Sequence, residues 1–364
     1  MRHALLAWTP LHVVTSLNLI ENFLKREDVT LYLYDEFTQA ETLYRTLKEL
    51  RKDIRVVRIS YQKMGPNYRS IPRLFFNTNP FTEEFFDHLY FPGDNYFGRL
   101  LYAQHHKSGK KFHLHYFEDG MAPYLGVPPM QVNNWVDQLQ LDWNKHSLFS
   151  GKWESEYLYR PDLVKRPLAD QKISLPPLKA GNPALEIIRE VFQKAYQIHP
   201  QEESEHGLLY FDQPFLHDKT GIDEVAVYQR VKEVADQVGW KAFVKLHPRS
   251  PKGKYGPVDY LETDLPWEIY LLFFDTKNLI MTTVNSTAAL SPYLLFEEKT
   301  PVLFLTEWVY RMYYDQADRH TRQVLDNSRS LLHLVTALYQ DRLFVPKDSE
   351  DLFEKLVTMD AASC

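Results

Sequence analysis

The chain has 364 residues, enough for two domains of ordinary size, and its 44% hydrophobic and 25% charged residues are typical of a soluble globular protein. The net charge of −6 at pH 7 offers no general attraction for nucleic acid or an anionic membrane, so we expect no nucleic-acid partner. The one cysteine, Cys364, excludes a disulfide framework, a cysteine-based zinc site and a cysteine nucleophile.

Short apolar segments alternate with amphipathic segments through the first part of the chain. The pattern predicts strands at 3–8, 29–35, 54–60, 88–93 and 111–117, and helices at 11–25, at 38–50 and after residue 93. Strands and helices that alternate at this spacing form a parallel sheet covered by helices. Residues 1–182 are therefore predicted to form a Rossmann-like domain that ends in a proline-rich linker at about 150–182.

The alternation restarts after the linker. A helix is predicted at 183–199, and then strands at 207–212, 242–247, 278–283 and 301–305 with helices at 223–239, 266–274 and 286–296. Two further helices are predicted near 328–340 and 350–359, as candidates for packing back on the first domain. Residues 183–364 then form a second Rossmann-like domain. Two such domains, with mostly parallel sheets facing across a cleft, describe the GT-B fold of glycosyltransferases, some epimerases and some binding proteins.

An acidic cluster follows the strand predicted at 111–117. Glu118, Asp119 and Gly120 lie where ligands of open α/β sheets bind, beyond the carboxyl ends of the strands. A carboxylate beside a like charge has a raised pKa and can accept a proton from a hydroxyl, and the glycine lets a substrate approach closely. The structural alternative is a helix N-cap or a turn, for which Asp-Gly is common.

A basic cluster follows the strand predicted at 242–247. His247 and Pro248 end this strand, with Lys245 and Arg249 on either side. A histidine between two cations at such a position can contact an anion and donate a proton to a departing phosphate. A histidine in a surface loop is the alternative.

Three further polar positions end strands or begin helices in the second half. Asn285, Ser286 and Thr287 precede a predicted helix, where free N–H groups and hydroxyls suit a phosphate or, alternatively, serve only as an N-cap. Glu268 lies in the first turn of another helix, and its carboxylate can accept both hydroxyls of a ribose. Asp212 ends the strand at 207–212 and is another candidate base.

Several common chemistries lack their motifs. The chain has no dinucleotide-binding or P-loop glycine pattern, no H-E-x-x-H, no G-x-S-x-G and no Asp-x-Asp of the metal-dependent sugar transferases. Two histidines of the segment HLH at 113–115 share one strand face, as in some metal sites, but no third ligand is apparent. Buried, hydrogen-bonded histidines are the preferred interpretation, and we expect no metal and no cofactor.

The order of these motifs resembles that of bacterial sialyltransferases of the lipooligosaccharide sialyltransferase and capsule polysialyltransferase group. The matching residues are Thr9-Pro10-Leu11-His12, Glu118-Asp119-Gly120, His247-Pro248 and Ser286-Thr287. The run from Pro266-Trp267-Glu268 to Ser286-Thr287 also resembles the donor half of related sialyltransferases. The resemblance implies a GT-B fold, a CMP-sialic acid donor, an inverting reaction without metal, and a glycan acceptor that ends in galactose or sialic acid.

The resemblance also implies roles for individual residues. Asp119 or Glu118 would be the general base, with Asp212 as a rival, and His247 would stabilise or protonate the departing phosphate. The implied donor-binding residues are Lys245, Pro248, Arg249, Glu268, Asn285, Ser286 and Thr287. The implied substrate-lining residues are Thr9, Pro10, His12 and Gly120.

Two other functions fit the same scaffold. One is a GT-B transferase that uses CMP-Kdo or a UDP-hexose, and the other is a non-catalytic protein that binds sugar nucleotides. The aromatic stretch at 73–97 is a candidate for stacking on acceptor sugars.

The sequence predicts a cytoplasmic protein, because polar residues break the apolar run at 4–20 and no cleavage site follows it. The basic stretch KSGKK at 107–111 is a candidate contact with the cytoplasmic face of the inner membrane, or else a solvated turn.

Overall fold

The computed structural model describes residues 1–64, 73, 79–130, 138, 151–199, 206–261, 263–298, 300–339 and 342–363. The chain divides into two compact units, Met1–His199 and Pro200–Cys364. The predicted boundary after residue 182 is therefore too early. Helix α7 (Ala184–Tyr196) buries Leu185, Ile188 and Phe192 and packs on two helices of the first unit, α1 (Pro10–Phe23) and α2 (Ala40–Leu50).

The first unit is built on a seven-stranded parallel sheet in the order β3-β2-β1-β4-β5-β6-β7. The strands are β1 (Arg2–Ala7), β2 (Asp28–Tyr34), β3 (Arg55–Ile59), β4 (His88–Phe91), β5 (His113–Phe117), β6 (Ser155–Leu158) and β7 (Gln171–Ser174). The described helices besides α1, α2 and α7 are α3 (Tyr61–Met64), α5 (Tyr96–Lys107) and the short η2 (Pro161–Leu163).

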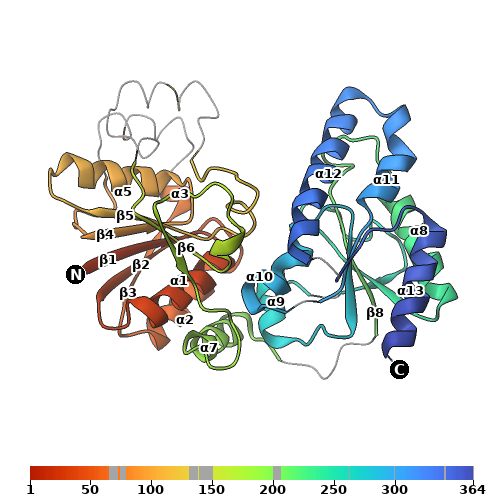
Figure 1. Ribbon diagram of the computed structural model, residues 1–364. Helices are drawn as coiled ribbons and strands as arrows, with labels where there is room; N and C mark the ends of the chain where they lie inside the picture. The colour runs from red at the N-terminus through yellow and green to blue at the C-terminus, as the bar shows by residue number, and fades with distance from the viewer. Residues whose placement is uncertain are drawn as a thin grey trace. The chain divides into compact units, whose positions relative to one another are not determined.

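Strand order reverses at β1, whose neighbours are β2 on one side and β4 on the other. Because crossovers between parallel strands are right-handed, α1 and α2 cover one face of the sheet and α5 covers the other (Figure 1). A ligand of such a sheet binds beyond the carboxyl ends of the strands, next to the point of reversal. For this unit, that place is the set of loops that follow β1, β4 and β5.

The second unit is built on a six-stranded parallel sheet in the order β10-β9-β8-β11-β12-β13. The strands are β8 (Gly207–Phe211), β9 (Lys241–Lys245), β10 (Asp259–Tyr260), β11 (Leu279–Thr283), β12 (Val302–Phe304) and β13 (Leu343–Phe344). Gly207 lies so close to β9 that an added Cβ would meet the Lys241 carbonyl oxygen at 2.4 Å, so this position accepts only glycine.

Helices cover both faces of the second sheet, with α8 and α13 on one face and α9 and α10 on the other (Figure 1). The helices are α8 (Glu224–Gln237), α9 (Trp267–Phe273), η3 (Thr287–Leu290), α10 (Ser291–Phe296), α11 (Thr306–Tyr313), η4 (Tyr314–Gln316), α12 (Arg319–Tyr339) and α13 (Ser349–Ser363). The last helix, α13, packs on α8 of its own unit. The prediction of a two-domain α/β fold with parallel sheets is confirmed.

No helix in the described part of the chain is long and apolar enough to cross a membrane. The basic stretch at 107–111 forms an exposed turn at the end of α5, as expected for solvated lysines.

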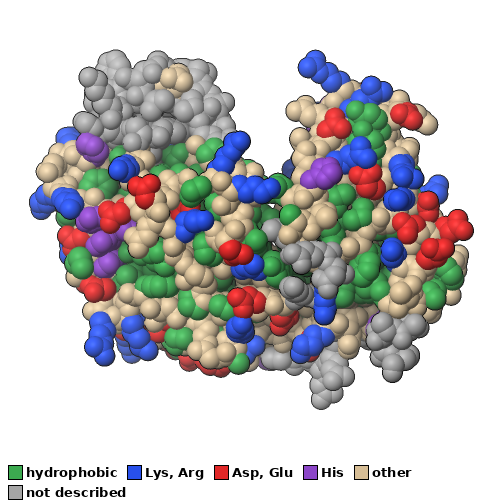
Figure 2. All heavy atoms as spheres, in the orientation of Figure 1, with side chains coloured by type: hydrophobic (Ala, Val, Ile, Leu, Met, Phe, Trp, Pro, Cys, Tyr) green, Lys and Arg blue, Asp and Glu red, His purple; other side chains and the backbone are tan. Residues whose placement is uncertain are grey.

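Four histidines from three neighbouring strands stack at the amino-terminal edge of the first sheet. The ring centroid of His88 lies 4.6 Å from that of His3, 4.8 Å from that of His113 and 5.2 Å from that of His115. Figure 2 shows histidine side chains gathered on this part of the surface. Within the described residues, no group of three or more histidines, cysteines or acids can hold a metal ion. This array is held instead by contacts such as that of His88 Nδ1 with His115 Nε2, 2.9 Å apart.

The histidine array makes the folded state sensitive to acid. Burial, with the neighbouring His88, lowers the pKa of His3 to about 4 and that of His115 to about 3 from the usual 6.5. The unfolded chain therefore binds more protons below pH 6.5. The free energy of unfolding should fall as the pH drops from 6.5 toward 4, by up to about 1.4 kcal/mol per pH unit for each histidine.

Urea unfolding at several pH values above 5, where nearby carboxylates stay charged, measures this slope. We expect His115→Phe to flatten the slope, and His199→Phe, which replaces an exposed histidine, to leave it unchanged. Equal slopes for all three proteins would show that the array does not control acid stability.

Candidate functional site

The candidate residues fall into two groups, one at the carboxyl edge of each sheet. In the first unit they follow β1 and β5, and in the second unit they follow β8, β9 and β11 or begin α9. Each group is described by itself.

Asp119 and His12 form a hydrogen-bonded pair in the first unit. Asp119 lies two residues beyond β5, and its side chain is 45% exposed. Its Oδ1 lies 2.8 Å from Nε2 of His12. His12 belongs to the first turn of α1, and its side chain is fully buried. The other ring nitrogen of His12 accepts a long hydrogen bond of 3.4 Å from the Trp8 N–H. Nε2 of the neutral ring therefore carries the hydrogen atom and donates a hydrogen bond to Oδ1 of Asp119.

This arrangement suits a general base. The buried imidazole fixes one oxygen of Asp119, while the other oxygen, Oδ2, has no protein donor among the described residues. Gly120 follows at a φ of +54°, a left-handed conformation that glycine adopts without strain. The chain thus turns away directly after Asp119 and leaves its carboxylate accessible to a hydroxyl.

Glu118 has a different environment from its neighbour. Its side chain is buried, and Oε2 accepts hydrogen bonds from the Tyr159 N–H at 2.7 Å and from the Tyr124 hydroxyl. Burial raises the pKa of Glu118 to about 8, so the side chain is protonated at neutral pH. Glu118 therefore ties the loop after β5 to the end of β6, and Asp119 is the carboxylate that faces solvent.

The substrate-lining residues predicted near the start of α1 hold the helix in place. The Thr9 hydroxyl caps the helix by accepting the His12 N–H at 3.2 Å, and Pro10 occupies the first helical position. The His12 side chain is buried and is hydrogen-bonded to Asp119, so it does not line a solvent-accessible surface.

One residue of this group was not predicted. The ring of Trp8 lies 4.5 Å from that of His12, edge to face, and remains partly exposed. A tryptophan immediately before the Thr-Pro turn, at the end of a buried strand, was the available sequence clue.

The aromatic stretch at 73–97 belongs mostly to the core. Phe86, Tyr90, Phe91 and Phe97 are buried, and the Tyr32 ring packs on two of them. The proposed stacking on acceptor sugars is wrong for these residues, because their faces are covered. Residues 74–78 lie outside the part of the chain that the structure describes.

In the second unit, Asp212 is a buried carboxylate whose two oxygens both accept hydrogen bonds. Its Oδ1 accepts from Lys254 Nζ at 2.8 Å and from the Tyr255 hydroxyl at 2.6 Å, and its Oδ2 accepts from the His247 N–H at 2.9 Å. The side chain is fully buried. Asp212 thus holds the loop after β9, and nothing in its environment presents it to a substrate hydroxyl.

His247 presents one N–H group from this loop. Its Nδ1 accepts the Arg249 N–H at 3.1 Å, so the proton of a neutral ring lies on Nε2, which has no partner among the described residues. Burial, reinforced by the Arg249 charge, lowers the pKa of His247, so the ring is neutral near pH 7. The Arg249 guanidinium itself pairs with Asp218 at 2.9 Å, and Pro248 is exposed.

Lys245 and Glu268 are opposite charges at the end of β9 and the start of α9. Burial lowers the pKa of Lys245 and raises the pKa of Glu268, and the attraction between the two groups opposes both shifts. Glu268 Oε1 accepts from the Ser291 hydroxyl at 3.3 Å. The Lys245 ammonium has no hydrogen-bond partner in the described residues, so its donors remain available to an anion.

The loop after β11 contributes two hydroxyl groups. Ser286 donates its N–H to the Thr283 hydroxyl at 2.7 Å, but the hydroxyls of Ser286 and Thr287 have no partner among the described residues. Asn285 donates through Nδ2 to the Ser328 hydroxyl at 2.8 Å, so that side chain fixes the loop to α12.

These donors lie on two strand ends separated by β8. Neighbouring strands are about 4.8 Å apart, so the ends of β9 and β11 lie roughly 10 Å apart. An ammonium, an imidazole N–H and two hydroxyls over this distance match a phosphate with a neighbouring ribose.

Comparison with known proteins adds information about the fold. No family model and no curated protein matches the chain. Among solved structures, UDP-GlcNAc 2-epimerase from Neisseria meningitidis, bound to UDP-GlcNAc, aligns with a TM-score of 0.52 and 14% identity, over 99% of this chain and 92% of that chain. The UDP-GlcNAc 2-epimerase from Methanocaldococcus jannaschii aligns with a TM-score of 0.52 and 12% identity, over 99% and 100% of the two chains. Identities this low establish the fold alone: the chain has two Rossmann-like α/β domains of the GT-B type.

Proposed function

We propose that this chain is an inverting glycosyltransferase that moves a sugar from a nucleotide-sugar donor to a hydroxyl group of a glycan acceptor. The Asp119–His12 pair carries this proposal. A general base needs an accessible carboxylate held in one orientation, and the hydrogen bond of 2.8 Å from the buried His12 ring to Asp119 Oδ1 provides this. A protein that only binds a ligand does not need such a pair.

In this proposal the first unit binds the acceptor. Asp119 Oδ2 accepts the hydroxyl proton while the acceptor oxygen forms a bond to the anomeric carbon of the donor. The bond from that carbon to the phosphate oxygen breaks in the same step, so the sugar configuration inverts. The Nε2–H group of His12 stays hydrogen-bonded to Oδ1 and keeps the carboxylate oriented.

The second unit binds the donor in this proposal. Lys245 and the hydroxyls of Ser286 and Thr287 would bind the phosphate, whose negative charge grows as the sugar leaves. The His247 N–H would donate to the departing phosphate oxygen, and Glu268 would accept the ribose hydroxyls. These groups would supply the charge stabilisation that a metal ion supplies in other transferases.

Two donor classes have specific support. CMP-sialic acid is supported by the order of the sequence motifs, which resembles that of bacterial sialyltransferases of the lipooligosaccharide and capsule group. A UDP-hexose is supported by the fold, which is shared with enzymes crystallised with UDP-GlcNAc. CMP-sialic acid carries a single phosphate group, and one half-buried cation, Lys245, suits the charge of that group.

Nucleotide release identifies the donor. The full chain is incubated with CMP-sialic acid, CMP-Kdo or UDP-hexoses and a series of galactosides, with EDTA present or absent. We expect release of CMP or UDP from one donor class only, dependent on acceptor and unchanged by EDTA. Epimerisation of the donor without release, or binding without turnover, would overturn the proposal.

A further inference from the structure

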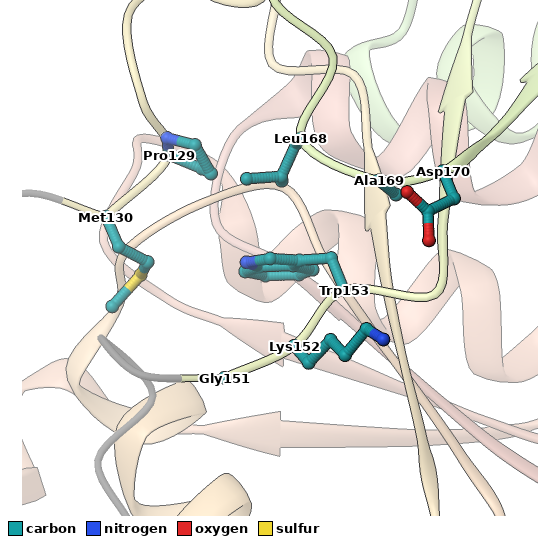
Figure 3. Close-up of a pocket in the computed structure, with 8 residues that line it drawn as sticks. All are labelled: Pro129, Met130, Gly151, Lys152, Trp153, Leu168, Ala169 and Asp170. Carbon is teal, nitrogen blue, oxygen red and sulfur yellow. The ribbon is translucent and has the colours of Figure 1, made fainter.

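The first unit contains a cavity of about 350 Å³ (Figure 3). Its lining includes Pro129, Met130, Lys152, Trp153, Leu168 and Asp170. Pockets for small ligands span about 300–1,000 Å³, so this cavity has room for one sugar ring and not for a nucleotide sugar.

Trp153 connects the cavity to β5, the strand that precedes Asp119. The indole packs edge to face on Tyr116 of β5, with ring centroids 6.0 Å apart. The Tyr116 hydroxyl in turn accepts the Asp119 N–H at 3.4 Å. The wall of the cavity and the candidate base therefore share one aromatic neighbour.

Pro129 provides a second connection, on the side of Trp8. The Pro129 carbonyl oxygen lies 3.5 Å from the position that a Cβ of Gly93 would occupy, and the Trp8 ring lies 3.9 Å from the same position. Gly93 thus separates the rim of the cavity from the tryptophan next to His12 by the width of one residue. Two chains of contacts, one through Tyr116 and one through Gly93, therefore link the lining of the cavity to Asp119 and to Trp8.

The lining combines apolar and polar groups in the way that sugar sites do. In Figure 3 the Trp153 ring lies at the centre, with Pro129 and Leu168 on one side and Lys152 on the other. Trp153 is only 7% exposed, so it offers a ring edge more than an open face. Lys152 and Asp170 are exposed, and their ammonium and carboxylate can hydrogen-bond to sugar hydroxyls.

We propose that this cavity is a second sugar subsite, which binds the residue next to the reacting sugar of an oligosaccharide acceptor. This inference rests on the proposed transferase function. Lys152 and Asp170 would bind the hydroxyls of this second sugar, while Trp153 and Pro129 would contact its carbon–hydrogen edges. The enzyme should then prefer a disaccharide to a monosaccharide with the same terminal sugar.

Acceptor kinetics test the subsite. We expect kcat/KM for lactose to exceed that for methyl galactoside, and the double variant Lys152→Ala/Asp170→Ala to lower this ratio about 10-fold, as the loss of two hydrogen bonds predicts. Trp153→Leu should lower it as well. Lys52→Ala, at an exposed lysine between α2 and β3, serves as the control and should keep the ratio.

A binding measurement separates this inference from the proposed function. Saturation-transfer NMR of the wild type with lactose, without any donor, should show contacts that the double variant loses. Transfer to both acceptors with an unchanged ratio, and no loss of lactose contacts, would overturn the subsite and leave the transferase function standing. Lactose contacts that depend on Lys152 and Asp170 in a chain that transfers no sugar would support the subsite and overturn the function.

Discussion

Asp119→Asn is expected to lower kcat for sugar transfer by about 10²–10⁴-fold, the range that a positioned general base contributes. The asparagine oxygen can still accept the His12 N–H, so the local structure should persist while the capacity to take up a proton is lost. The donor KM should change little, because the proposed donor residues lie in the other unit. Initial rates at saturating donor and varied acceptor measure both effects.

Glu118→Gln is the matched control for this prediction. Glu118 is buried and protonated at neutral pH, so an amide of the same size should replace it with only a few-fold change in kcat. A variant pair with the opposite behaviour, an inactive Glu118→Gln and an active Asp119→Asn, would move the base to the buried position and contradict the assignment.

Lys254→Met is expected to destabilise the second unit by about 3–5 kcal/mol, the cost of removing one partner from a buried ion pair. The Lys254 side chain is only 6% exposed and pairs with Asp212 at 2.8 Å and with Glu224, both of which are buried. Its removal leaves two carboxylates without a countercharge. Urea unfolding of the full chain measures the loss.

The matched control is Lys252→Met, at an exposed lysine of the same loop, which should change the free energy of unfolding by at most about 0.5 kcal/mol. The double variant Lys254→Met/Glu224→Gln should recover part of the loss, because one unpaired charge is then removed. Equal stability of Lys252→Met and Lys254→Met would show that the ion pairs contribute nothing to the fold.

Much of the fold follows from local sequence patterns. Strands such as β1, β2 and β8 are continuous apolar runs, as buried parallel strands are, and helices such as α7 and α8 have apolar residues at helical spacing. These patterns suffice to predict two Rossmann-like domains, because alternation of the two element types leaves few topologies.

The elements that the sequence did not indicate are those that depend on tertiary contacts. Strands β6 and β7 have only four residues each, with the sequences SEYL and QKIS, and they lie in a proline-rich region that indicated a linker. Their strand character comes from pairing with β5 and with each other. Helix α12 begins at Arg319, earlier than predicted. The sequence did not indicate this start, because the first turns of the helix are mostly polar and exposed.

The candidate site was predictable as a set of strand ends and not as a set of contacts. The position of Asp119 after β5 indicated a possible base, but its partner His12 lies 107 residues away in the sequence, and only the fold brings the two together. Similarly, the position of Asp212 at a strand end indicated a possible base, but its hydrogen bonds with Lys254, Tyr255 and His247 give it a structural role. Strand ends indicate where ligands bind, whereas side-chain partners decide what each residue does.

Mass spectrometry of the acceptor tests the central claim most directly. The full chain is incubated with lactose and a mixture of CMP-sialic acid and UDP-hexoses, and both the acceptor and the free nucleotides are measured. We predict that lactose gains one sugar while the matching nucleotide appears in equal amount. Consumption of a nucleotide sugar without any change in the acceptor would contradict the claim that this chain is a glycosyltransferase.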